Sequence, residues 1–171
     1  MVTITLPCRP WLAICLLLAL LSGSGARAQE AVKELLEFPS IAKGAPVTVR
    51  AELFLPANVT GKLPAMVIHH GSGGVTDARE YAYAREFTKM GVASIIPDSF
   101  AARGIKSTVS DQLGAPTSEM VADAYGALKA AAKHPRLDPG RIGTTGFSKG
   151  GSVALRSALA SFAERNAPGG P

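Results

Sequence analysis

A glycine-rich stretch near the C-terminal end holds the first candidate for a reactive side chain. Residues 143–152 read GTTGFSKGGS, which combines four glycines with two serines and one lysine. Glycines let a backbone approach a ligand, or another part of the chain, more closely than other residues do. The stretch therefore has three chemical interpretations: a phosphate-binding loop, a dinucleotide-binding turn, or a sharp turn that presents a serine nucleophile. A plain connection without chemistry is the fourth.

The spacing of the glycines and the lysine argues against both nucleotide-binding interpretations. A phosphate-binding loop needs its lysine directly after a glycine and a hydroxyl residue directly after the lysine. Lys149 instead follows Ser148 and precedes Gly150, so the pattern fails at both places. A dinucleotide-binding turn needs G-x-G-x-x-G after a strand. The glycines at 143, 146, 150 and 151 do not have that spacing.

The pattern that the stretch does meet is G-x-S-x-G, over residues 146–150. In this pattern a strand runs into a helix through a strained turn that exposes the serine hydroxyl. The flanks agree, because RIGTTGF (141–147) is typical of a strand and GGSVALRSALASF (150–162) of a helix. A helix N-terminus under the serine favours the negative charge that develops during acyl transfer. We therefore interpret Ser148 as a candidate nucleophile.

A second glycine-rich stretch supplies what such a nucleophile needs. Acyl transfer requires two backbone N–H groups that point at the developing oxyanion. One belongs to the residue after the nucleophile, here Lys149, and the other to a loop after an earlier strand that often opens with His-Gly. MVIHHGSGG (66–74) offers such a strand and loop. We expect His69 to pack or cap at the strand end, and His70 to shape the loop rather than to transfer protons.

Strands and helices alternate along the rest of the chain. The patterns predict strands over 47–55, 63–70, 92–97 and 141–147, helices over 77–90, 117–133 and 149–164, and a polar lead-in over 29–46 with room for a first short strand. This order predicts an α/β fold with a mostly parallel sheet and flanking helices. The connection of about twenty residues after the third strand is long, and such loops are usually functional.

The N-terminal stretch is predicted to be a signal peptide. Arg9 precedes an apolar run over 11–21, and Ala26-Arg27-Ala28 is an A-x-A cleavage site. The run is shorter than the roughly 20 residues that a membrane-spanning helix needs, although an uncleaved anchor is the alternative. We expect residues 1–28 to be removed on export to the periplasm or the medium. A domain over 29–171 would remain, without a membrane segment.

Composition narrows the possible partners and cofactors. Both cysteines lie in the predicted signal peptide, so a thiolate metal site or a cysteine nucleophile is not expected in the mature domain. The formal net charge is +5, but the basic residues are scattered rather than clustered, which argues against nucleic-acid binding. We expect neither a metal nor another cofactor, and a small molecule as the partner.

Three segments together make the sequence similar to the dienelactone hydrolase family, which has the α/β-hydrolase fold. They are VIHHGSGG (67–74), VASIIPDSFAARG (92–104) and RIGTTGFSKGG (141–151), within a resemblance that runs from about residue 47 to 160. The resemblance implies hydrolysis of a carboxylic ester or lactone through an acyl-enzyme on Ser148. It further implies that the N–H groups of Ser72 and Lys149 form the oxyanion hole.

The same resemblance gives Arg103 two possible roles. It matches an arginine that meets an acidic substrate in some family members. The alternative is a solvated arginine or one that braces the loop, with Asp98 as a possible partner. The best-known members use a cysteine nucleophile, so Ser148 groups this chain with the serine-type relatives.

The catalytic triad of such hydrolases is incomplete in this sequence. Its order is serine, acid, histidine, but the residues after Ser148 contain one acid, Glu164, and no histidine. His134 lies in a helix–strand link, where we expect the opposite end of the sheet. We therefore expect a C-terminally truncated family member whose strand 141–147 is an exposed edge. A secreted serine hydrolase and a non-catalytic remnant or ligand-binding protein of the same fold both stay open.

Overall fold

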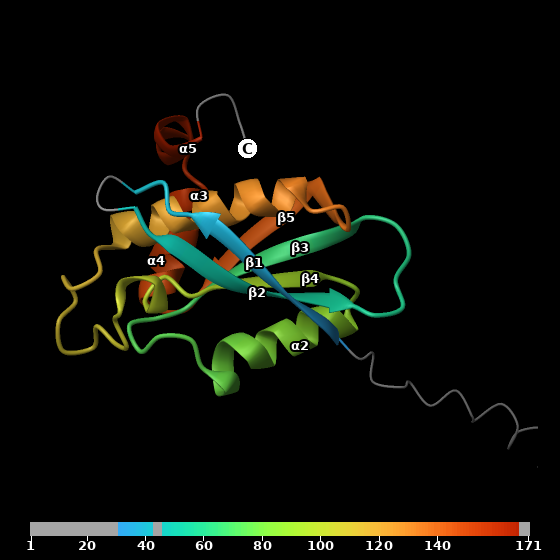
Figure 1. Cartoon of the computed structure of the whole chain (residues 1–171), viewed down its shortest axis with the longest axis horizontal. Helices are drawn as coiled ribbons and strands as arrows, with labels where there is room; N and C mark the ends of the chain where they lie inside the picture. The colour runs from blue at the N-terminus through green and yellow to red at the C-terminus, as the bar shows by residue number, and fades with distance from the viewer. Residues whose placement is uncertain (1–30, 43–45, 168–171) are drawn as a thin grey trace, which may run out of the picture.

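The computed structural model describes residues 31–42 and 46–167, so the predicted signal peptide (1–28) lies outside the described residues. Five strands form one sheet in the order β1-β2-β4-β3-β5 (Figure 1). They are β1 (Ala31–Pro39), β2 (Thr48–Pro56), β3 (Leu63–His69), β4 (Ala93–Pro97) and β5 (Leu137–Gly146). The helices are η1 (Asp77–Tyr81), α2 (Ala82–Lys89), η2 (Ala101–Arg103), α3 (Thr117–Lys133), α4 (Lys149–Ser157) and α5 (Ala160–Asn166).

The sheet is mixed: β1, β3, β4 and β5 run in one direction and β2 runs in the other, which agrees with the expectation of a mostly parallel sheet. β3 pairs in parallel with β4 and with β5, whereas β2 pairs antiparallel with β1 and with β4. Parallel neighbours need a long crossover, and the helices after β3 and β4 provide it. Only eight residues separate β1 from β2, too few for such a crossover, and these two strands pair antiparallel. The predicted α/β architecture with flanking helices is confirmed.

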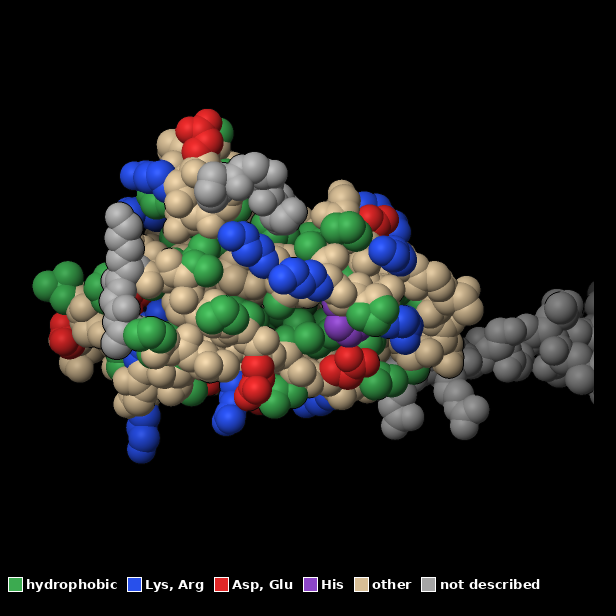
Figure 2. Space-filling view, turned by 45° about the horizontal axis from the view of Figure 1, so that its top comes forward, with side chains coloured by type: hydrophobic (Ala, Val, Ile, Leu, Met, Phe, Trp, Pro, Cys, Tyr) green, Lys and Arg blue, Asp and Glu red, His purple; other side chains and the backbone are tan. Residues whose placement is uncertain are grey.

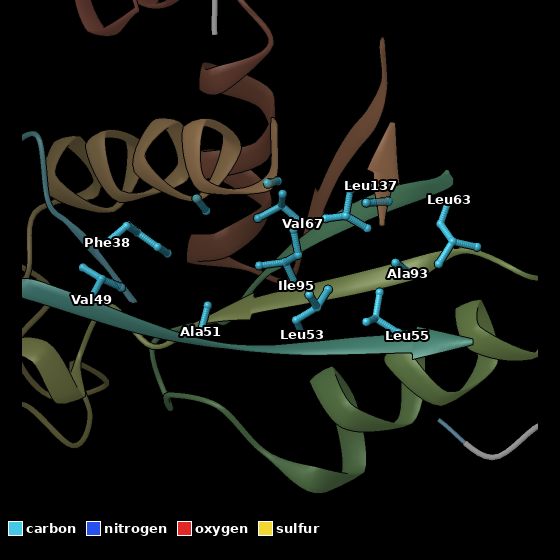
Figure 3. Close-up of a cluster of buried hydrophobic side chains, with 13 residues drawn as sticks. Phe38, Val49, Ala51, Leu53, Leu55, Leu63, Val67, Ala93, Ile95 and Leu137 are labelled. Atoms are coloured by element: carbon cyan, nitrogen blue, oxygen red, sulfur yellow. The ribbon is translucent and has the colours of Figure 1, made fainter. Parts of the chain in front are cut away.

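Helices cover both faces of the sheet. Figure 1 shows α3 and α4 over one face and α2 over the other. Successive side chains of β2 point to opposite faces of the sheet, as they do in any strand. Leu53 and Leu55 join the core on the α3 side, which Figure 3 shows, and Phe54 joins the smaller core on the α2 side. None of the described helices is long and apolar enough to cross a membrane.

Two elements differ from the prediction by more than one residue at a boundary. β5 starts at Leu137 rather than at 141, because the buried Leu137 joins the core and Leu63 N–H donates to Arg136 O at 2.8 Å. The predicted helix over 149–164 is two helices, α4 and α5, separated by Leu159 in an extended conformation. The break lets Phe162 pack against the apolar cluster around α3.

Charged side chains of both signs are interspersed on the face of the molecule that Figure 2 presents. β5 forms one edge of the described sheet, as expected for the strand before Ser148. Ser148 and the loop after β3 both follow the carboxyl ends of parallel neighbours, so the sheet brings these two segments to the same end.

Candidate active site

Ser148 occupies a strained turn between β5 and α4. Its backbone angles are φ 51° and ψ −114°, and it is the one non-glycine residue of the described ranges with a positive φ. Such a conformation costs on the order of 1–3 kcal/mol and persists only where the surrounding structure enforces it. The side chain is exposed, and α4 begins at the next residue. This is the strand–serine–helix geometry that the spacing predicts.

Gly146 and Gly150, on either side of Ser148, are required because the backbone of the turn lies in close contact with itself and with the end of β3. A Cβ on Gly150 would lie 2.2 Å from His69 O and 2.6 Å from His70 O, and a Cβ on Gly146 would lie 2.3 Å from Gly150 O. All of these neighbours are backbone atoms. Any side chain at either glycine would therefore push the turn away from β3.

The glycine-rich loop over 71–74 lies directly against this turn. Gly74 N–H donates to Gly71 O at 3.1 Å and closes the loop. The position that a Cβ on Gly71 would take is 3.5 Å from Ser148 Cβ and 3.1 Å from Phe147 O. The structure therefore brings together the two glycine-rich stretches that the sequence analysis singled out.

Neither Ser72 N–H nor Lys149 N–H donates a hydrogen bond to another group of the described residues. Among the described residues Ser72 N–H has no acceptor in the protein. Lys149 is the first residue of α4, and the first N–H groups of a helix have no intrahelical acceptor. The described residues hold no cluster of histidine, cysteine or acidic side chains that would bind a metal. The site thus offers a hydroxyl and two backbone donors.

The long β4–α3 loop (98–116) is tied to both of these residues. Ser72 O accepts a hydrogen bond from Thr108 N–H at 2.7 Å, and Ser72 Oγ donates to Gln112 Oε1 at 2.9 Å. Lys149 Nζ donates to Gln112 O at 2.8 Å. Lys149 is a buried residue, and the partial loss of solvation lowers the pKa of its ammonium group. The loop therefore holds both residues in place through Ser72 O, Ser72 Oγ and Lys149 Nζ, and it leaves their backbone N–H groups unpaired.

A charged pair in the first turn after the glycine loop was not singled out from the sequence. Arg79 Nε donates to Glu80 Oε1 at 2.7 Å, and its Nη2 donates to Gly74 O at 3.1 Å. The guanidinium also lies 5.6 Å from the centre of the Phe147 ring. Glu80 is fully buried and accepts the Thr76 N–H at 2.8 Å. The only signal in the sequence is an adjacent Arg-Glu pair shortly after HHGSGG.

Each of the three histidines has a partner other than Ser148. His69 is the last residue of the buried strand β3, and its Nε2 lies 3.0 Å from Thr144 Oγ1 of β5. His70 Nδ1 lies 2.9 Å from Gly71 O, which agrees with the expected role in shaping the loop. His134 pairs with Glu34 at 3.1 Å and precedes β5, at the end of that strand opposite to Ser148, as expected.

The burial of His69 predicts a sensitivity to acid. Burial, with a further contribution from His70, lowers its pKa from 6.5 to about 3. The unfolded chain therefore takes up the proton first, and folding stability falls as the pH drops from 6.5 towards 3. The slope from this residue is about 1.4 kcal/mol per pH unit.

We expect His69→Gln to remove that slope, because glutamine does not titrate. The free energy of unfolding, measured in urea between pH 7 and pH 4.5, should fall less steeply in the variant than in the parent. A constant loss of stability at every pH reports only the changed packing. An unchanged slope would show that His69 does not carry the acid sensitivity.

Arg103 is fully engaged within the protein. Its five N–H donors go to Glu119 Oε2, Ser99 O, both carboxylate oxygens of Asp123 and Ser40 Oγ. Burial disfavours its charge, but the Asp123 hydrogen bond and the Asp123 and Glu119 charges outweigh this and raise its pKa.

This arrangement favours the loop-bracing alternative over the expectation that Arg103 meets a substrate. No donor of the guanidinium is left for a ligand. Asp98, the partner considered from the sequence, instead accepts the N–H groups of Phe100 and Ala101. Glu164, the one acid after Ser148, is an exposed residue of α5.

Known structures place this fold among the α/β hydrolases. A dienelactone hydrolase-like promiscuous phosphotriesterase from metagenomic libraries is 22% identical with a TM-score of 0.58, and the match covers 80% of this chain and 56% of that one. A hypothetical protein from Pseudomonas aeruginosa is 23% identical with a TM-score of 0.61, over 77% and 40% of the two chains. Est1E from Butyrivibrio proteoclasticus is 21% identical with a TM-score of 0.54, over 71% and 44%.

The chain thus spans about half the length of the solved structures that it matches. No curated protein gives a significant match. The model of the dienelactone hydrolase family matches residues 49–167, which include the loop after β3, the β4–α3 loop and the turn at Ser148. On this match, the chain belongs to the dienelactone hydrolase family.

Proposed function

We propose that this chain carries the nucleophile and the oxyanion hole of an exported serine hydrolase that cleaves carboxylic esters or lactones. The observation that carries the proposal is the strained, exposed Ser148 between a strand and a helix, packed against the glycine loop over 71–74. The export rests on the sequence of residues 1–28 alone. The ester or lactone class rests on the family.

The proposed chemistry is acyl transfer. Ser148 Oγ attacks the carbonyl carbon, its proton passes to a general base, and the carbonyl oxygen becomes an oxyanion. The N–H groups of Ser72 and Lys149 donate to that oxyanion, and the N-terminus of α4 adds a favourable field. The tetrahedral intermediate expels the alcohol, which takes the proton, and leaves an acyl-enzyme. A water molecule then hydrolyses the acyl-enzyme in the same way.

The general base is the group that the described residues do not supply. Within residues 31–42 and 46–167 the three histidines bind other groups, and none forms a hydrogen bond with Ser148. A serine without a base is a weak nucleophile. All three histidines of the sequence are among these residues, so in this proposal the base, a histidine held by a carboxylate, is supplied from outside the 171 residues.

The same observation favours a second candidate function. Without a base, the fold and its two free N–H groups would still bind a small carbonyl compound or anion without turning it over. This alternative is a non-catalytic ligand-binding protein of the same fold.

A fluorophosphonate probe tests the proposal, because it reacts with activated serines. Without the base, the oxyanion hole and the helix N-terminus still leave residual reactivity, so we expect slow labelling of the folded chain that is lost in Ser148→Ala. Ser152→Ala is the matched control, since Ser152 is an exposed serine one turn further along α4, and it should label like the parent. Absence of labelling in a chain that circular dichroism shows to be folded would favour the ligand-binding alternative.

A further inference from the structure

Two hydrogen bonds converge on one carbonyl group next to Ser148. Gly71 O accepts the Gly74 N–H at 3.1 Å and lies 2.9 Å from His70 Nδ1. A carbonyl oxygen can only accept, so the hydrogen of the second bond must be on His70 Nδ1. The bond therefore selects the tautomer of His70 that is protonated at Nδ1.

Fixing this carbonyl also fixes the N–H group on the other side of the same peptide bond. Gly71 C=O and Ser72 N–H share one peptide unit, which is planar, and the described residues contain no cis peptide. In a trans peptide the two groups point in opposite directions. Whatever holds Gly71 O in place therefore sets the direction of Ser72 N–H.

His70 is itself held firmly. Its side chain is fully buried, and its ring meets the Phe100 ring edge-on with the centres 4.4 Å apart. Its other nitrogen, Nε2, is buried and has no hydrogen-bond partner among the described residues. The imidazole therefore contributes a single hydrogen bond, the one to Gly71 O.

The surroundings keep the His70 imidazole neutral. Burial is the largest effect and lowers its pKa. The bond to Gly71 and the charges of Asp98 and Glu80 act in the opposite direction, and the charge of Arg79 adds to the lowering. The bond to Gly71 O requires a hydrogen on Nδ1, and in a neutral ring this leaves Nε2 without one.

We propose that His70 is a positioning residue for the oxyanion hole, because its Nδ1–H holds the Gly71–Ser72 peptide so that Ser72 N–H faces outwards for a ligand. The inference rests on the proposed function only in assigning Ser72 N–H to the binding of an oxyanion. The orientation itself is a property of the folded chain.

The first test reads the tautomer in the parent protein. Long-range proton–nitrogen correlation spectra of the labelled chain should show His70 neutral and protonated at Nδ1 at pH 7. A neutral ring whose proton is on Nε2 would overturn the proposal, because Nδ1 could then not donate to Gly71 O. This measurement needs neither activity nor a variant.

The second test reads the direction of Ser72 N–H from its residual dipolar coupling. His70→Asn places an amide donor near the position of Nδ1, whereas His70→Leu fills the space without a donor. We expect the parent's coupling in the asparagine variant and a changed or averaged coupling in the leucine variant, with the couplings of β3 unchanged in both. An unchanged Ser72 coupling in a folded leucine variant would overturn the proposal.

Probe labelling of Ser148 then separates the two hypotheses. If the parent labels, His70→Leu should lower the labelling rate by about tenfold or more and His70→Asn should largely restore it. If the parent does not label but the tautomer and the couplings are as expected, the proposed hydrolysis fails and the positioning role stands.

Discussion

Gly150→Ala is expected to destabilise the folded chain by about 3 kcal/mol or more, which would lower the melting temperature by roughly 10 °C. The added Cβ would lie 2.2 Å from His69 O and 2.6 Å from both His69 C and His70 O. All three are backbone atoms of the strand end, so no flexible side chain can move aside. Helix propensity alone predicts the opposite sign, since alanine is favoured over glycine in a helix by about 1 kcal/mol.

Gly73→Ala is the matched control for this substitution. Gly73 lies in the neighbouring loop, its φ is not positive, and a Cβ there would meet no atom within 4 Å. We expect its free energy of unfolding, measured in urea, to stay within about 0.5 kcal/mol of the parent value. If Gly150→Ala were as stable as Gly73→Ala, the close approach of the turn to β3 would be wrong.

Asp123→Ala is expected to cost about 3 kcal/mol, because it leaves a buried guanidinium with part of its partners missing. The Asp123 side chain is 1% exposed and accepts Arg103 Nη1 at 2.8 Å and Nη2 at 3.1 Å, together with the Ser40 hydroxyl. Glu119 and Ser99 would still bind Arg103, which is why the loss stays at the lower end for a broken buried pair.

Arg50→Ala is the control, because it breaks a solvent-exposed ion pair whose loss can be compared with that of the buried Arg103–Asp123 pair. Arg50 and Glu37 lie 2.8 Å apart on β2 and β1, with side chains 73% and 48% exposed. Pairs of this kind contribute at most about 1 kcal/mol. We expect the free energy of unfolding, measured in urea, to be clearly lower for Asp123→Ala than for Arg50→Ala. Equal losses would contradict the structural role assigned to the Arg103 network.

The elements that the sequence predicts best are those with a strong local pattern. The helix over 117–133 is observed with the predicted bounds, and the buried strands β3 and β4 differ from the predictions by one residue at one end. The apolar residues of the helix repeat with its period, and the two strands are short continuous apolar runs bounded by turn residues, so no distant contact is needed to identify them.

The observed elements differ from the predicted ones where contacts between residues far apart in the sequence set the boundaries. β5 begins early because Leu137 packs in a core shared with β2 and β3, and α4 ends because the chain turns back to pack Phe162 near α3. The antiparallel half of the sheet follows from which strands lie side by side, which a period-two pattern does not encode. These are tertiary effects, and local patterns carry no information about them.

The candidate site shows the same division. The turn at Ser148 could be predicted because the spacing of its glycines reflects a backbone contact that any such turn must make. The engagement of Arg103 could not, since Asp123, Glu119 and Ser40 are 20, 16 and 63 residues away along the chain. The roles of Ser148, Ser72 and Lys149 in catalysis stay predictions.

The most direct test of the account is to find the residue that a fluorophosphonate probe modifies. After labelling of the folded chain, digestion and mass spectrometry should place the phosphonyl group on the peptide that contains Ser148, and fragmentation should assign it to that hydroxyl. Ser72, Ser152 and Ser157 should remain unmodified. An adduct on another residue, or none on the folded chain, would contradict the claim that the turn between β5 and α4 presents a reactive serine.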